Sequence, residues 1–84
     1  MEYHLIMCRS LTYAQRAVYL LERKGMTVNL LKVPQSVSQT GCNYGVRVPS
    51  RYVHLSLDVL KKNHVIYGKI FRYERDGSLE EVNL

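Results

Sequence analysis

The stretch YHLIMCRSLTYAQRAVYLLERKG, from Tyr3 to Gly25, predicts a strand followed by a helix, and the fold prediction starts from it. Residues Tyr3 to Cys8 are almost all apolar, which indicates a buried strand. The next segment has apolar side chains at helical spacing, at Ala14, Ala17, Val18 and Leu21. Thr12 and Gln15 fit a capping box, and Gly25 favours a helix stop. We therefore expect a helix over residues 12–24.

The rest of the chain repeats this alternation of strand and helix. Further strands are expected at residues 26–33, 44–48 and 65–73, where apolar and β-branched residues are concentrated. A second helix is expected to open at Pro49-Ser50 and to stop at Asn63, where asparagine tolerates a left-handed backbone. Its expected apolar stripe consists of Val53, Leu57 and Leu60, widened by Leu55 and Val59.

The order β-α-β-β-α-β predicts an α+β, ferredoxin-like sandwich. Right-handed crossovers would give a four-stranded antiparallel sheet in the order 4-1-3-2, with two helices on one face. The length of 84 residues predicts a single domain with its core in residues 3–73. Residues 74–84 contain Asp76-Gly77, which predicts either a hairpin with a short edge strand through Leu79 to Val82 or a frayed tail.

Composition limits the classes of protein to consider. No apolar run is long enough to span a membrane, and Glu2 with no basic segment before the first apolar run argues against a signal peptide. We therefore expect a cytoplasmic protein whose two cysteines are reduced thiols. The net charge of +5 is compatible with nucleic acid, anionic small molecules or an acidic partner. A homodimer is compatible with so small a domain.

The loop SVSQTGCNYG, from Ser36 to Gly45, places Cys42 beside Gly41 among polar residues. In the predicted topology this loop shares one edge of the sheet with the end of the first strand and the start of the first helix. The partial positive charge of that helix start and the adjacent Arg9 and Ser10 would favour a reactive thiolate. We predict Cys42 as a nucleophile in a loop shaped by Gly41 and Asn43; the alternative is a bystander cysteine.

Cys8 ends the first predicted strand, and two interpretations of it stay open. It is either a small buried hydrophobic residue or a second thiol that forms a reversible disulfide with Cys42. The disulfide requires that the two Cα atoms lie within roughly 7 Å.

Several short motifs occur in an order that is typical of one family. They are Ser10, Ala14, Leu20-Leu21-Glu22-Arg23-Lys24-Gly25, Leu31-Lys32-Val33-Pro34, Ser36, Ser38, Cys42, Gly45-Val46-Arg47-Val48 and the helix with Leu57 and Leu60. In these motifs the chain resembles the Se/S (selenium/sulfur) carrier protein-like family of small bacterial domains. The resemblance implies that Cys42 accepts a chalcogen atom as a persulfide or selenopersulfide and passes it on between a protein donor and a protein acceptor. It implies no cofactor and no enzyme activity of the domain by itself.

Two other functions remain as alternatives. The first is a small regulatory or interaction domain that pairs through an apolar sheet face containing Ile6, Tyr67 or Phe71. The second is an RNA-binding module, because the same sandwich can present aromatic and basic residues on its sheet. The basic-Gly-aromatic signature of such modules is missing from residues 43–48.

The three histidines do not predict a metal site. His4, His54 and His64 fall in different expected elements, and no spacing typical of zinc ligands occurs.

Overall fold

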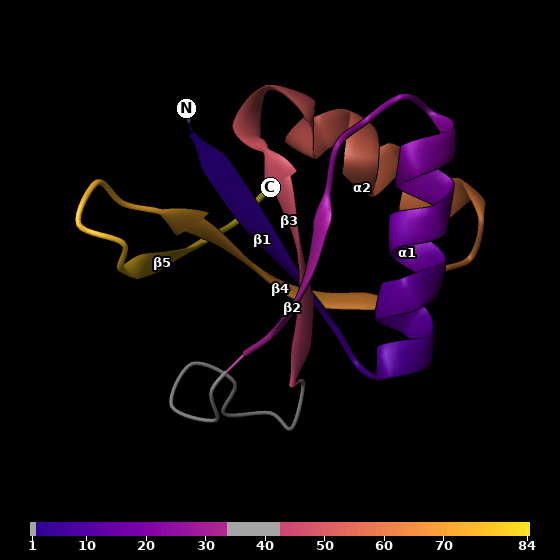
Figure 1. Cartoon of the computed structure of the whole chain (residues 1–84), viewed down its shortest axis with the longest axis horizontal. Coiled ribbons are helices and arrows are strands. Elements are labelled where there is room, and N and C mark those ends of the chain that lie inside the picture. Colours follow the sequence, from indigo (N-terminus) through magenta and orange to yellow (C-terminus); the bar gives the residue numbers. More distant parts are fainter. Residues whose placement is uncertain (1, 34–42) are drawn as a thin grey trace.

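Five strands form one antiparallel sheet in the computed structural model, which describes residues 2–33 and 43–84 (Figure 1). The elements in chain order are β1 (Tyr3–Cys8), α1 (Leu11–Arg23), β2 (Asn29–Lys32), β3 (Tyr44–Pro49), the 3-10 turn η1 (Ser50–Tyr52), α2 (Val53–Lys62), β4 (Tyr67–Tyr73) and β5 (Leu79–Val82). The strand order is β2-β3-β1-β4-β5. The protein is therefore a small α+β domain with an open sheet.

The prediction of a four-stranded sheet is wrong, because the sheet has a fifth strand. The first four strands have the predicted relative order, but β5 extends the sheet beside β4. The Asp76-Gly77 turn makes this possible, because Gly77 has a φ of 87° and the Ser78 amide donates to Asp76 Oδ1 at 2.9 Å. Of the two interpretations of the last residues, the hairpin strand is confirmed and the frayed tail is wrong.

The central strand β1 pairs with β3 on one side and β4 on the other. Cys8 lies opposite Tyr44 of β3 and opposite Tyr67 of β4. Between Ile6 and Cys8 the pairing with β4 shifts, because Ile6 faces Ile70 while Cys8 faces Tyr67. This bulge gives β4 one extra residue and keeps Tyr67 on the same face of the sheet as Ile70.

Both helices cover one face of the sheet. The main core contains Ile6, Cys8, Val46 and Ile70 from the strands together with buried residues of α1 and α2. A second cluster on the opposite face contains Leu5, Met7, Val33 and Phe71. β1 therefore has buried side chains on both faces, which explains its continuous apolar sequence.

This arrangement corrects the expected apolar patch on the sheet. Ile6 is fully buried on the helix-covered face, where Tyr67 also packs, whereas Phe71 lies in the second cluster. Strand alternation and the bulge in β4 place them on different faces. A pairing face that contains Ile6 or Tyr67 is therefore wrong.

The helices agree with the sequence in their buried faces and differ at their ends. Ala14, Ala17 and Leu21 of α1 are buried, as predicted, but Leu55 of α2 is 48% exposed. The buried residues of α2 are Val53, Ser56, Leu57, Val59 and Leu60, so Val59 widens the stripe as predicted and Leu55 does not. After α2, the residue with positive φ is His64 (58°) and not Asn63, whose φ is −101°.

Gly25 ends α1 with a left-handed backbone, as the sequence predicts. Its φ is 86°, its amide donates to the Glu22 carbonyl at 3.0 Å, and the Met26 amide donates to the Leu21 carbonyl at 3.2 Å. These two bonds form a Schellman motif. A Cβ built at Gly25 meets no atom within 4 Å, so the cost of a larger residue there comes from the backbone alone.

Gly25→Ala is expected to lower the free energy of unfolding by about 1 kcal/mol, because alanine resists the left-handed region. Urea denaturation followed by circular dichroism measures the loss. Gly25→Asn is the matched control and should lose less, because asparagine tolerates this conformation. Equal losses in the two variants would contradict the backbone explanation.

Candidate functional site

The loop that contains Cys42 begins and ends at one edge of the sheet. The Val33 amide donates to the Asn43 carbonyl at 2.7 Å, and Lys32 lies opposite Tyr44 in the strand pairing. Tyr44 in turn lies opposite Cys8, the last residue of β1. We call this region the loop edge and define it by Cys8, Arg9, Ser10, Val33, Asn43 and Tyr44. It joins the two ends of the loop to the start of α1.

Ser10 caps the start of α1 at the loop edge. Its backbone is extended, and its side-chain Oγ accepts a hydrogen bond from the Tyr13 amide at 3.3 Å. The predicted capping box of Thr12 and Gln15 is wrong, because the helix already begins at Leu11. The first turn of α1 has no acidic side chain, so no local carboxylate offsets the partial positive charge of this helix end.

Cys8 is buried in the main core with 0% of its surface exposed. Its Sγ lies 3.9 Å from the Ile6 carbonyl, towards which the thiol can donate a weak hydrogen bond. It packs with the residues that join the helices to the sheet. A reagent in solvent therefore reaches this thiol only if the core opens at the end of β1. Its role as a second thiol stays a prediction.

The structure describes some of the other predicted site residues and leaves others out. Arg9 is exposed directly after Cys8. Asn43 is half-buried, and its side-chain Oδ1 is buried with no hydrogen-bond partner among the described residues. Cys42 and Gly41 lie outside the described residues. The structure therefore brings Arg9, Ser10 and Asn43 to the same edge as Cys8, and the role of Cys42 stays a prediction.

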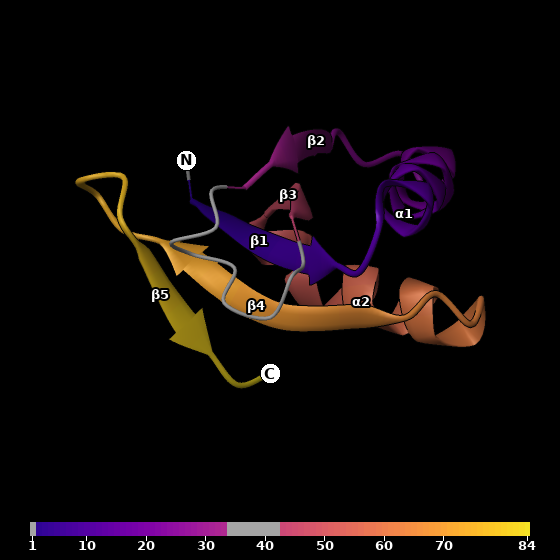
Figure 2. The same ribbon diagram turned by 90° about the horizontal axis from the view of Figure 1, so that it is seen from below.

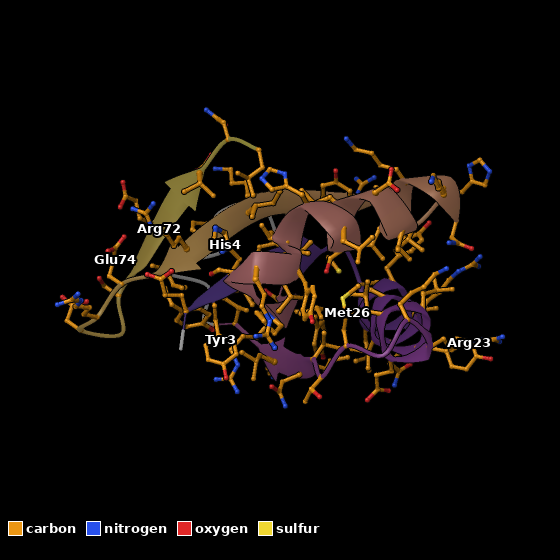
Figure 3. The ribbon with its side chains drawn as sticks, turned by 90° about the horizontal axis from the view of Figure 1, so that it is seen from above. Tyr3, His4, Arg23, Met26, Arg72 and Glu74 are labelled. Carbon is orange, nitrogen blue, oxygen red and sulfur yellow. The ribbon has the colours of Figure 1, made fainter. Side chains whose placement is uncertain are left out.

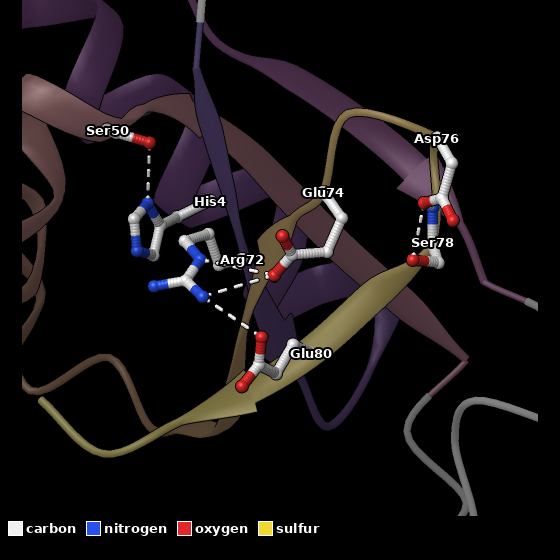
Figure 4. Close-up of polar contacts among 7 residues, drawn as sticks. All are labelled: His4, Ser50, Arg72, Glu74, Asp76, Ser78 and Glu80. Atoms are coloured by element: carbon white, nitrogen blue, oxygen red, sulfur yellow. Dashed lines mark hydrogen bonds and ion pairs between the residues drawn. The ribbon is translucent and has the colours of Figure 1, made fainter.

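A polar row that the sequence analysis did not predict lies at the opposite end of β1 (Figure 4). His4 Nδ1 lies 2.7 Å from Ser50 Oγ, and His4 pairs across the sheet with Arg72. Arg72 in turn forms ion pairs with Glu74 at 3.1 Å and Glu80 at 2.9 Å. Burial is the largest cause that lowers the pKa of His4 from its usual 6.5, and the positive charge of Arg72 is the second largest. His4 was noticeable in the sequence as the polar residue of an apolar strand.

The row borders a hollow of about 720 Å³ lined by residues of β1, β4 and the segments next to them, among them Glu2, His4, Arg72 and Arg75. Arg72 and Glu74 of its lining form an ion pair with one another. In the described part of the chain, no group of three or more His, Cys, Asp or Glu side chains could hold a metal ion. Within the same residues, no helix is long and apolar enough to cross a membrane.

One family model matches residues 3–72, which run from the first residue of β1 to the last but one of β4. The family is described as "Putative Se/S carrier protein-like". The chain belongs to this family. No curated protein and no solved structure gives a significant match. The match to the Se/S carrier-like family covers both helices and β1 to β3, so it includes the whole loop edge.

Cys8 of this Se/S carrier-like protein is expected to resist alkylation in the folded state, because its side chain is fully buried. Iodoacetamide labelling, read at each site by mass spectrometry, measures the rate. Labelling should be at least about a hundredfold faster in denaturing urea than in buffer, since local opening of a core position is rare. A rate in buffer close to that of the unfolded chain would contradict the burial.

The lowered pKa of His4 predicts a loss of stability in mild acid. Above a pH of about 6.5 both the folded and the unfolded histidine are neutral; below it the unfolded chain binds the proton more readily. The free energy of unfolding should therefore fall as the pH drops from about 7.5 to about 5. In His4→Gln this fall should be smaller, as urea denaturation across the pH range would show. An identical pH dependence in the variant would contradict a buried neutral His4.

Proposed function

We propose that this protein carries sulfur or selenium as a persulfide or selenopersulfide on Cys42. Membership of the Se/S carrier-like family over residues 3–72 is the observation that carries the proposal. The carrier role needs an accessible cysteine, a thiolate at neutral pH and stabilisation of an anionic product. The loop edge supports the last two requirements.

The start of α1 is the source of this stabilisation. Ser10 fixes the beginning of the helix, and no acidic side chain in the first turn opposes its positive end. The exposed Arg9 adds a full positive charge beside it. Both ends of the loop are held at this edge through the hydrogen bond between Val33 and Asn43. An anionic sulfur near this edge is favoured relative to the neutral thiol.

The transfer step balances without an external oxidant or reductant. The Cys42 thiolate attacks the terminal sulfur of a cysteine persulfide on the donor protein. A sulfur–sulfur bond forms at Cys42 as the sulfur–sulfur bond of the donor breaks, and the donor cysteine leaves as a thiolate. An acceptor thiolate can attack the Cys42 persulfide in the same way. In the selenium version of the step, the transferred atom is selenium instead of sulfur. The protein then acts as a carrier in reactions that other enzymes catalyse.

We also propose that the β1–α1–β2–β3–α2–β4 unit is a ferredoxin-like sandwich to which β5 has been added. The element order and the strand order support this assignment. In such a unit the ends of alternate strands meet at one edge, which is the geometry that the carrier proposal uses.

Incubation with sodium polysulfide, a small sulfur donor, tests the proposal. The native protein is expected to gain the mass of one sulfur atom on the Cys42 peptide, and a strong thiol such as dithiothreitol should remove it. Cys42→Ser should lose the modification completely. Cys8→Ala, the matched control with the other cysteine removed, should keep it. Modification on Cys8 alone, or none in the native protein, would overturn the proposal.

The pH dependence of Cys42 alkylation tests the thiolate argument separately. The midpoint of the rate should lie below the free-thiol value of about 8.5. In Arg9→Gln the midpoint should rise, because a positive charge has been removed beside the helix start. A midpoint at the free-thiol value in both proteins would contradict the role given to the loop edge.

A further inference from the structure

Charges are strongly segregated along the chain. Residues 3–73 contain eleven of the twelve lysines and arginines but only two acids, Glu22 and Asp58. The other five acids are Glu2, Glu74, Asp76, Glu80 and Glu81. Separated charges give the protein a positive and a negative side in addition to its net charge. The resulting electrostatic field can orient a charged partner.

The same separation exists in space. The β4–β5 hairpin, with most of the acids, projects from the end of the molecule opposite to α1 (Figure 2). Arg23 of α1 likewise lies far from Arg72 and Glu74 (Figure 3). Three of the four ion pairs between described residues lie in the hairpin, where they neutralise Lys69 and Arg72. The fourth joins Lys62 to Asp58 of α2.

Exposed cations that lie far apart in the sequence are carried by three segments that contact one another, namely the start of α1, the middle of α1 and the end of α2. Arg16 Nη2 of α1 donates to the Asn63 carbonyl at 3.3 Å, which ties α1 to the end of the helix that carries Lys61 and Lys62. β4 begins shortly afterwards at Tyr67, opposite Cys8, and Arg9 follows Cys8 in the chain. We call this region the helical basic surface and define it by Arg9, Arg16, Lys61 and Lys62, all of which are exposed.

Two large apolar side chains are exposed within the same region. Leu11, the first residue of α1, is 39% exposed, and Ile66, just before β4, is 50% exposed. Leu11 follows Arg9 by two residues and Ile66 follows Lys62 by four, and exposed apolar side chains with cations near them in the chain are a common composition of protein interfaces. Phe71 of β4 is buried on the other face, with Tyr73 packed against its cluster, and Tyr67 packs against the main core, so these aromatic side chains do not form a stacking platform here.

We propose that the helical basic surface docks an acidic protein that exchanges sulfur or selenium with this carrier, so that the proposal rests on the proposed function. The partner would present carboxylates to Arg9, Arg16 and Lys61, and apolar side chains to Leu11 and Ile66. Attraction between the two charged surfaces speeds encounter and orients the partner towards the loop edge. The acidic hairpin at the other end repels the same partner, which disfavours docking in the wrong orientation.

Binding of a fluorescently labelled peptide of alternating glutamate and leucine tests the surface by fluorescence anisotropy. The variant Arg16→Glu/Lys61→Glu reverses two charges of the helical basic surface. The variant Arg51→Glu/Arg75→Glu reverses two charges outside it and changes the net charge equally, so it is the matched control. Leu11→Ser removes one apolar contact without a change of charge. Circular dichroism confirms that each variant is folded.

Arg16→Glu/Lys61→Glu is expected to weaken peptide binding roughly tenfold, and the control pair less than about twofold. Leu11→Ser should weaken it severalfold, and binding should weaken between about 50 mM and about 200 mM salt. Equal losses in the two charge pairs would overturn the proposal, since the attraction would then be general. It would also be overturned if the peptide failed to bind, or if a single-stranded RNA oligonucleotide bound the surface more tightly than the peptide.

Polysulfide modification of Cys42 in the same variants separates this proposal from the carrier role. A small donor needs no docking. Cys42 of Arg16→Glu/Lys61→Glu should therefore be modified at the native rate, although the affinity of this variant for the peptide is lower. If the native protein is not modified but binds the peptide as expected, the carrier proposal fails and the docking surface stands. If modification is normal and the two charge pairs bind the peptide alike, the docking surface fails and the carrier proposal stands.

Discussion

Burial of β1 on both faces is the constraint on which the rest of the structure depends. Leu5 and Met7 fill one face, while Ile6 and Cys8 fill the other. A strand of this kind has to lie between two neighbouring strands and under a covering layer. Each apolar side chain left exposed would give up the roughly 1.5–3 kcal/mol of stabilisation that its burial contributes. β3 and β4 are those neighbours, both helices form the layer over Ile6 and Cys8, and Leu5 and Met7 pack with Val33 and Phe71 on the opposite face. The central position of β1 then determines where its last residue lies.

The candidate site follows from that position. Because β1 ends in the middle of the sheet, the start of α1, the start of β4 and both ends of the 34–42 loop have to converge near Cys8. The positive end of α1 and the exposed Arg9 are thereby brought to one end of the sheet. Four of the seven carboxylates lie in the hairpin that β5 forms with β4. The fold thus places the positive end of a helix and most of the acidic side chains in different parts of the protein.

Sequence patterns predicted the elements whose structure is determined locally. The apolar run of β1, the stripe of α1 and the stop at Gly25 need only neighbouring residues to be recognised. The predictions were wrong where tertiary contacts decide. The capping box was predicted at Thr12 and Gln15, whereas the cap is Ser10, two residues after the end of β1. The Asp76-Gly77 turn left a hairpin and a frayed tail as alternatives, and the pairing of β5 with β4, accompanied by the ion pair between Arg72 and Glu80, decides for the hairpin.

The candidate site was predictable to a similar extent. The topology was sufficient to bring Arg9, Ser10, Asn43 and Cys8 to one edge, while the burial of Cys8 depended on the packing of both helices. The polar row of His4 and Ser50 joins positions 46 residues apart, so no spacing in the sequence could indicate it. Cys42 and Gly41 remain sequence predictions.

The two outermost strands limit how the sheet can grow. β2 and β5 are four residues each, and both carry charged or polar side chains, at Asn29 and Lys32 in one and at Glu80 and Glu81 in the other. A short, charged edge is a poor template for a strand from another molecule. Stacking of copies into a continuous β-ribbon is therefore disfavoured, and so is the aggregation that starts from it. The two edges of the open sheet thus act against self-association of the protein through its strands.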